Sequence, residues 1–339
     1  GVCLGTLGPG ATNLTTGVAN AHFDRSPLVA ITGQGSTMRL HKESHQNMNV
    51  VDMFRPITKW ATTIRQPENI PEVIHKAFKY ASEEKPGACH IELPEDIAKL
   101  DHDLSPIRSK GYKLRRPAPD YKAIKQALTI LSSAKKPLIL AGNGCIRKRA
   151  SKQLKIFTDK TGIMVAHTFM GKGAIDDRDP HSLLTAGLGS RDHISEAFDH
   201  ADVVIAIGYD MIEWHPDRWN ANGDKKIIHI DFEPAEVDTH YQCEVEIVSD
   251  IASALWEINE GVTEKLKFDV PEFQHLREHM LHEIGFPEFS TELHVDIDQD
   301  AAGKCSSEAF PMKPQRILMD LRQIMGDEDI LISDVGAHK

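Results

Sequence analysis

The sequence predicts an α/β fold, in which parallel sheets are formed by strands that alternate with helices along the chain. The first supporting observation is a series of short apolar runs, which are typical of strands buried on both faces of a sheet. The second is that the longer segments between these runs carry apolar residues at helical spacing. The third is the length of 339 residues, which is enough for two domains or more.

A first domain is predicted over residues 1–97. It opens with an apolar run at 2–7, interpreted as a buried strand, which breaks at Gly8-Pro9-Gly10 and enters a helix over 11–24. Such a break brings backbone N–H groups close to whatever lies at the start of the helix. Helically spaced apolar residues predict a second helix over 70–81 with one buried face. Further strands are predicted over residues 28–33, 57–62 and 88–93.

Residues 98–119 are rich in lysine, arginine and aspartate and end with two closely spaced prolines, which is typical of a linker between domains. A second α/β domain, a central one, is predicted over residues 120–262 and begins with a helix. Its strands are predicted over residues 137–141, 203–207 and 227–230. The segment Gly208-Tyr209-Asp210 follows one of these strands, at the edge where parallel sheets bind ligands.

Residues 263–310 show no sustained periodicity apart from one short helix, and they are predicted to form a long linker. Residues 311–339 are predicted to begin a third domain, with a helix that starts at Pro314 and ends at Gly326, and a strand over 330–333. The chain starts without methionine, directly on a predicted internal strand, and stops shortly after another strand. We therefore expect it to be the middle of a longer polypeptide.

Composition and charge argue against several classes of function. The chain carries 39 lysine and arginine residues against 50 aspartate and glutamate residues, a formal charge of -11, which argues against a nucleic-acid binder. No apolar run approaches the ~18 residues that a membrane span needs, so no membrane association is expected. The five cysteines are scattered without a C-x-x-C pair, which indicates a reducing compartment, and we expect a cytoplasmic protein.

Several motifs resemble those of a known family. Residues 8–13, together with residues 24–29 and Gly33, resemble the first domain of thiamine-diphosphate-dependent enzymes. Within that superfamily, the stretches that resemble acetolactate synthases are residues 45–46, 54–59, 86–87, 92–96 and 334–338. The stretches that resemble the catabolic, flavin-independent branch are residues 208–210, 219–220 and 228–231. These landmarks occur in the family's order over nearly the whole chain.

The resemblance implies a parallel-sheet pyrimidine-binding domain, a central Rossmann-like α/β domain and a truncated pyrophosphate-binding domain. It also implies acetolactate synthase activity, in which pyruvate is decarboxylated and joined to a second pyruvate, giving 2-acetolactate and CO2. The product would serve acetoin or branched-chain amino acid synthesis. The family's active sites lie between subunits, so a homodimer or homotetramer is implied.

The cofactors implied by the resemblance are thiamine diphosphate, which accepts the electrons released by decarboxylation, and Mg²⁺. The glutamate that activates the cofactor in this family would lie before Gly1, and the metal ligands would lie beyond Lys339. No metal ligand is therefore predicted within the chain, and the chain alone is predicted to be inactive.

The resemblance assigns roles to residues that match the family's motifs. Gln46 would hydrogen-bond pyruvate, His45 would pair with the substrate carboxylate or transfer protons, and Lys59 would lie near the same pocket. The residues implied for cofactor binding are Pro9, Gly10 and Asn13 on the pyrimidine side and Val335, Gly336, Ala337 and His338 on the phosphate side. Without a ligand role, Pro9, Gly10 and Asn13 would form a plain turn, His45 and Gln46 an exposed polar loop, and Lys59 would be a solvated or salt-bridged strand residue.

The sequence argues against FAD. The turn Gly142-Asn143-Gly144 resembles a nucleotide-binding turn but lacks the third glycine of the dinucleotide fingerprint. Biosynthetic acetolactate synthases carry an arginine after the glycine of a later strand, where it contacts FAD, whereas here Gly208 is followed by Tyr209 and Asp210. We therefore expect no FAD.

Other functions remain open. Residues 275–279 read H-x-x-E-H, a metalloprotease signature, but they lie in linker-like sequence, and chance matches are common among 18 histidines, so zinc is not expected. Within the superfamily, the chain could instead act as a pyruvate oxidase or a sulfoacetaldehyde acetyltransferase-like enzyme. Residues 120–262 alone could form a non-catalytic nucleotide-binding module.

Overall fold

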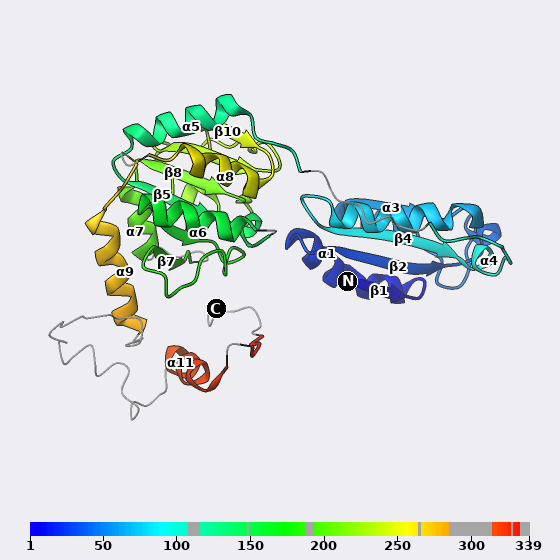
Figure 1. Ribbon diagram of the computed structural model, residues 1–339. Helices are drawn as coiled ribbons and strands as arrows, with labels where there is room; N and C mark the ends of the chain where they lie inside the picture. Colours follow the sequence, from blue (N-terminus) through cyan, green and yellow to red (C-terminus); the bar gives the residue numbers. More distant parts are fainter. Residues whose placement is uncertain are drawn as a thin grey trace.

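The computed structural model describes residues 1–107, 116–147, 149–187, 193–263, 266–284, 314–326 and 328–332. It contains two α/β domains, each built on a sheet whose strands pair in parallel (Figure 1). The predicted fold class is thereby confirmed. In these ranges no helix is both long and apolar enough to cross a lipid bilayer.

The first domain contains a four-stranded sheet in the order β1-β2-β4-β3. Its strands are Val2–Gly5 (β1), Leu28–Gln34 (β2), Trp60–Thr63 (β3) and Ala88–Pro94 (β4). Its helices are Pro9–Phe23 (α1), Val50–Phe54 (α2), Ile70–Ser82 (α3) and Glu95–Ala98 (α4). Successive residues of the inner strand β2 point to opposite faces, so Ala30 packs with α1 and α2 while Val29 packs with α3.

Strand β1 lies at the edge of this sheet and pairs with β2. Its outer residues Val2 and Leu4 are 49% and 74% exposed. The prediction of a buried strand over 2–7 is therefore wrong about burial. In the described part of the chain, β1 pairs with β2 and has no strand on its other side. The strand is also shorter than predicted, since the chain turns into α1 at Pro9.

The central domain contains a six-stranded sheet in the order β10-β9-β8-β5-β6-β7. Its strands are Pro137–Ala141 (β5), Met164–His167 (β6), Ser182–Thr185 (β7), Val203–Ile207 (β8), Lys226–Asp231 (β9) and Cys243–Val248 (β10). The helices α5 (Tyr121–Ser133), α6 (Ala150–Thr161) and α8 (Ile251–Gly261) pack on one face. The helices α7 (His193–His200) and α9 (Pro271–Ile284) pack on the other. The strand order reverses between β5 and β8, where doubly wound sheets bind ligands.

The predicted linker over 263–310 is wrong for its first part. Helix α9 carries Phe273, Met280 and Leu281, which are buried, and Phe273 and Met280 pack into the core beneath β6 and β8. This segment therefore belongs to the central domain. The helical pattern was weak because polar and charged residues fill the rest of the helix, including the buried Arg277.

Little of the predicted third domain lies within the described residues. Its predicted helix is present as α11, Pro314–Ile324. Residues 330–332 lie outside any strand, and Ile330 and Ile332 are exposed. Ser333 and the four predicted phosphate-side residues, Val335, Gly336, Ala337 and His338, lie outside the described residues.

Candidate active site

The carboxyl ends of the first domain's strands border a cavity of about 440 Å³. Its lining combines apolar walls, which include Leu7, Ile31 and Leu93, with a few polar side chains, Gln34, Arg39, His45 and Glu95. A larger cavity of about 620 Å³ lies beside α3, but it is mainly apolar, and only His75 and Lys79 bring ionisable groups to it. Ligand sites combine an apolar lining with a few convergent polar groups, which favours the cavity at the strand ends.

The turn before α1 and the loop that carries His45 and Gln46 are in direct contact. A Cβ atom placed on Gly8 would lie 2.7 Å from the Cβ and 2.8 Å from the carbonyl oxygen of Gln46. Gly8 also has a φ of 59°, which side-chain-bearing residues rarely adopt. The structure thus places the turn that leads into Pro9, Gly10 and Asn13 against Gln46. Pro9 and Asn13 are exposed.

A buried polar network fixes the chain beneath this cavity. Gln34 Nε2 donates to Glu92 Oε1 at 2.9 Å and to the Met48 carbonyl oxygen at 2.8 Å. Thr63 Oγ1 donates to Glu92 Oε2 at 2.7 Å. Gln34 and Glu92 are each 4% exposed. The network was not predicted, although a polar residue near the end of each of two adjacent apolar strands was a visible signal.

Lys59 lies at the other end of the first sheet from the cavity, where the strands begin. It precedes β3, its backbone N–H donates to the Ala88 carbonyl at 2.7 Å, and its Nζ donates to the Glu83 carbonyl at 2.8 Å. Burial lowers the pKa of Lys59. Because His45 follows β2 and Lys59 precedes β3, the two occupy opposite ends of a parallel sheet. Within the chain, the structure therefore does not bring Lys59, predicted near the pocket, together with His45 and Gln46.

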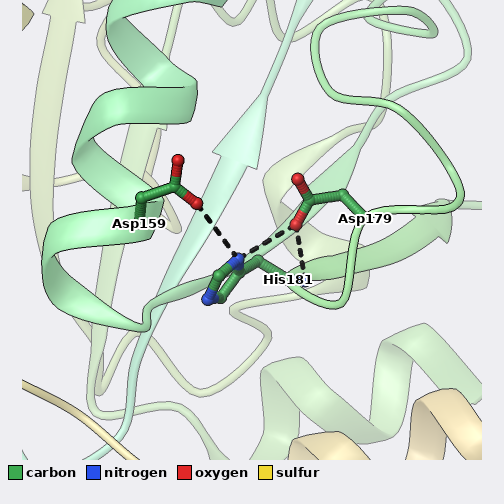
Figure 2. A group of neighbouring side chains, drawn as sticks. All are labelled: Asp159, Asp179 and His181. Atoms are coloured by element: carbon green, nitrogen blue, oxygen red, sulfur yellow. Dashed lines mark hydrogen bonds and ion pairs between the residues drawn. The ribbon is translucent and has the colours of Figure 1, made fainter.

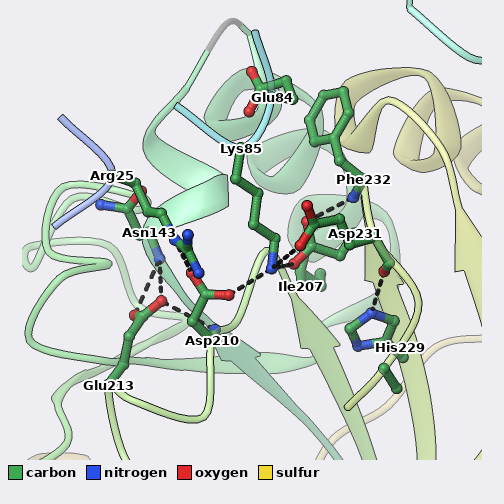
Figure 3. A network of polar contacts seen from close by, with 12 residues as sticks. Arg25, Glu84, Lys85, Asn143, Ile207, Asp210, Glu213, His229, Asp231 and Phe232 are labelled. Carbon is green, nitrogen blue, oxygen red and sulfur yellow. Dashed lines mark hydrogen bonds and ion pairs between the residues drawn. The ribbon is translucent and has the colours of Figure 1, made fainter. Parts of the chain in front are cut away.

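Buried ion pairs join the two domains at that end of the first sheet (Figure 3). Lys85 Nζ lies 2.5 Å from Asp210 Oδ1 and 3.0 Å from Asp231 Oδ2. Arg25 Nε lies 3.0 Å from Asp210 Oδ2. Burial alone would lower the pKa of Lys85, but Asp231 and Asp210 outweigh it and the pKa is raised. These ion pairs hold the first sheet, at the end where its strands begin, against the central sheet, at the end where its strands finish.

Another buried carboxylate, that of Glu213 in the loop that follows β8, contacts the turn that follows β5 (Figure 3). Its Oε1 accepts the N–H groups of Asn143 and Asp210, each at 3.1 Å, and Oε2 accepts the Thr168 hydroxyl. Glu213 is 3% exposed, and burial raises its pKa to about 7. In doubly wound folds, N–H groups at this edge bind the phosphates of dinucleotides. Here the chain's own carboxylate occupies those donors.

The glycine turn that follows β5 packs directly against the glycine that follows β8. A Cβ atom placed on Gly144 would lie 2.5 Å from Gly208 Cα, and the Gly144 N–H donates to the Gly208 carbonyl at 2.8 Å. These glycines therefore let the two loops approach each other closely. They do not form an open cradle for a ligand.

Comparison with known proteins identifies the family. Residues 1–53 match the model of the thiamine pyrophosphate enzyme N-terminal TPP binding domain, and residues 124–258 match that of the thiamine pyrophosphate enzyme central domain. The chain belongs to the thiamine pyrophosphate enzymes. The first match includes the turn at Gly8 and the His45-Gln46 loop.

Curated relatives align with the chain over its whole length. A probable acetolactate synthase large subunit from Methanococcus aeolicus is 33% identical, and the alignment covers 100% of this chain and 57% of the relative. Acetolactate synthase 2, chloroplastic, from Nicotiana tabacum is 33% identical, with 49% of its length covered. The acetolactate synthase of Bacillus subtilis is 30% identical, with 57% covered. The chain thus spans about half the length of these relatives.

Part of a thiamine diphosphate site fits the residues described. The carboxyl ends of the first sheet's strands border an apolar-lined cavity that includes Leu7, and α1, the helix that carries the exposed Asn13, begins two residues later at Pro9. Pro9, Gly10 and Asn13 would hold the pyrimidine side there. Among the described residues, no group of three or more potential metal ligands lies at this edge.

One group of potential metal ligands occurs in the described residues, far along the chain from the cavity (Figure 2). It consists of Asp159, Asp179 and His181, with His181 Nδ1 2.9 Å from Asp179 Oδ1. The Lys155 ammonium pairs with both carboxylates and lies 2.9 Å from Asp179 Oδ2. A cation of the chain therefore already neutralises this group, which we interpret as an ion-pair cluster.

The H-x-x-E-H segment lies on α9, as a helical signature requires. Its central residue Arg277 is buried and donates to the Asp177 carbonyl at 3.1 Å. Within the described residues its histidines and glutamate do not gather at metal-ligand spacing. The segment gives no support for a zinc site.

The raised pKa of Glu213 predicts a specific pH dependence of stability. Between the ordinary value of 4.5 and about 7, the folded protein binds more protons at this group than the unfolded chain does. The contribution of Glu213 to the free energy of unfolding should therefore fall as pH rises through this window, by at most about 1.4 kcal/mol per pH unit. Urea unfolding of the wild type and E213Q, compared at about pH 5 and pH 7, measures it. Equal pH slopes in the two proteins would contradict the prediction.

Proposed function

We propose that the whole protein is an acetolactate synthase of the flavin-independent type. The observation that carries this proposal is the alignment of the complete chain, at 30–33% identity, with acetolactate synthases of an archaeon, a plant and a bacterium. The cavity beside His45 supports it, because an apolar lining with few polar groups suits a small 2-oxo acid.

The reaction joins two pyruvates. The bond between the carboxylate and C2 of the donor breaks and CO2 leaves, a new bond joins the donor's C2 to the acceptor's C2, and the acceptor's carbonyl oxygen takes up a proton. Thiamine diphosphate, when bound, supplies the electron sink for decarboxylation. In the proposal, Gln46 hydrogen-bonds the substrate and His45 pairs with a carboxylate or moves a proton. The apolar wall of the cavity excludes water.

We also propose that the protein binds no FAD. At the carboxyl ends of the central domain's strands, the N–H groups of Asn143 and Asp210, which a dinucleotide phosphate would need, already donate to Glu213. Lys85 and Arg25 cover the same edge from the first domain. We further propose a homodimer or homotetramer with active sites between subunits, a cytoplasmic location and Mg²⁺ as the metal.

The test is an assay of the whole protein with pyruvate, Mg²⁺ and thiamine diphosphate, without FAD. The expected result is 2-acetolactate, detected as acetoin after acid decarboxylation. Activity that requires FAD would overturn the flavin-independent assignment. A requirement for inorganic phosphate, with acetyl phosphate as product, would favour a pyruvate oxidase-like enzyme. Absence of both products would overturn the acetolactate assignment.

A further inference from the structure

Arg39 brings a guanidinium group to the cavity at the carboxyl edge of the first sheet. Its Nη2 donates to Glu95 Oε2 at 2.8 Å, and its side chain is 45% exposed. A guanidinium carries five N–H donors in a planar fork, so one contact with Glu95 leaves donors for a second anion. His45 is the other basic side chain of the lining.

The backbone around Arg39 is held in place by the chain itself. The Asn47 side chain donates to the Arg39 carbonyl at 3.3 Å, and the Thr37 N–H donates to Asp96 Oδ1 at 3.0 Å. The Arg39–Glu95 and Thr37–Asp96 pairs together fasten the turn to the start of α4. Such anchoring orients the guanidinium before any ligand arrives, which reduces the entropy lost on binding.

We propose that Arg39 binds the carboxylate of the acceptor 2-oxo acid. This inference rests on the proposed function and deepens it by assigning a substrate group to a named side chain. A carboxylate matches the guanidinium fork in geometry and charge. The apolar walls formed by Leu7, Ile31 and Leu93 line the same cavity and suit the acceptor's alkyl group.

The chemistry of the reaction favours the acceptor's carboxylate over the donor's as the group that Arg39 binds. The donor's carboxylate loses its charge as CO2 forms, so an arginine bound to it would stabilise the ground state more than the transition state and slow the reaction. The acceptor's carboxylate persists unchanged into 2-acetolactate. A charged anchor on the acceptor therefore orients it throughout bond formation without opposing decarboxylation.

A competition between a charged and a neutral acceptor tests this assignment. The whole protein is given pyruvate and acetaldehyde together, with Mg²⁺ and thiamine diphosphate. Acetaldehyde as acceptor gives acetoin directly, pyruvate as acceptor gives 2-acetolactate, and both products share the same donor step. Their ratio is independent of how much enzyme is folded or loaded with cofactor. A merely structural defect would lower both products and leave the ratio unchanged.

R39Q is expected to raise the ratio of acetoin to 2-acetolactate about ten- to hundredfold, because it removes charge-assisted hydrogen bonds to pyruvate alone. R39K should raise it by less, about three- to tenfold, since the ammonium keeps the charge but not the fork. The matched control is R55Q, which removes an exposed arginine paired with Asp52 outside the cavity lining and should leave the ratio unchanged.

The possible results distinguish a failure of the proposed function from a failure of the role assigned to Arg39. A wild-type protein that forms no 2-acetolactate overturns the proposed function and the role of Arg39 with it. An active wild type whose ratio stays within about twofold in R39Q overturns the role of Arg39 alone, and so does an equal rise in R55Q. An R39Q protein that forms neither product also overturns it, because an acceptor anchor leaves the donor step intact.

Discussion

Replacing Lys85 with alanine is expected to lower the free energy of unfolding by about 3–5 kcal/mol. The substitution removes the cation that lies 2.5 Å from Asp210 and 3.0 Å from Asp231. Asp210 keeps its pair with Arg25, whereas Asp231 is the more deeply buried of the two carboxylates. The side chains of Asp210 and Asp231 are 11% and 1% exposed, so water cannot replace the lost partner. Removing one member of a buried ion pair is costly for this reason, even where the intact pair contributes little net stability.

Lys99 provides the matched control for this experiment. It pairs with Glu95 at 2.5 Å, but the two side chains are 70% and 44% exposed. K99A should therefore leave the free energy of unfolding almost unchanged. Urea unfolding followed by tryptophan fluorescence measures both variants. If K85A is no less stable than K99A, the junction between the domains does not depend on these ion pairs.

The junction at Lys85 also bears on where the chemistry can take place. Each parallel sheet has one carboxyl edge, and in α/β proteins that edge is the usual ligand site. In the central domain Glu213 and the ion pairs of Lys85 occupy the edge, whereas in the first domain the corresponding edge borders the cavity with Arg39 and His45. The arrangement favours the first domain as the part of the chain that meets substrate.

Sequence patterns predicted the strands that are buried on both faces, such as 203–207, because a short continuous apolar run is typical of an inner strand of a parallel sheet. They missed β10, whose burial alternates along an edge, and β6, which ends in a buried histidine. The pairing of Lys85 with Asp210 joins residues 125 positions apart and left no local signal. Contacts of this kind depend on the whole fold.

The position of Lys59 relative to His45 was missed for a different reason, which is the predicted bounds of one strand. His45 follows a predicted strand and Lys59 lies within the predicted strand 57–62, near its start once β3 is seen to begin at Trp60. In a parallel sheet, residues that precede a strand and residues that follow one lie at opposite edges. Family resemblance suggested a common pocket, whereas strand direction separates the two residues. The contact between Gly8 and Gln46, by contrast, could not be read from the sequence.

Replacing Gly208 with alanine is expected to lower the free energy of unfolding by about 2–5 kcal/mol, from left-handed backbone strain and overpacking together. Gly208 has a φ of 57°, and a Cβ atom there would lie 2.4 Å from Gly144 Cα. The obstacle is backbone, so no rotamer change can relieve it. The loops would have to separate, which would also move the Asp210 N–H away from Glu213.

Gly17 supplies the control, because it lies within helix α1 and a Cβ atom there would meet no atom within 4 Å. G17A should raise the free energy of unfolding by about 0.5–1 kcal/mol, since alanine loses less backbone entropy in a helix. Urea unfolding of both variants gives the comparison. A G208A protein as stable as the wild type would mean that the two loops can separate at little cost. The loops at the carboxyl ends of the central sheet's strands would then be adjustable, and a nucleotide could be accommodated between them.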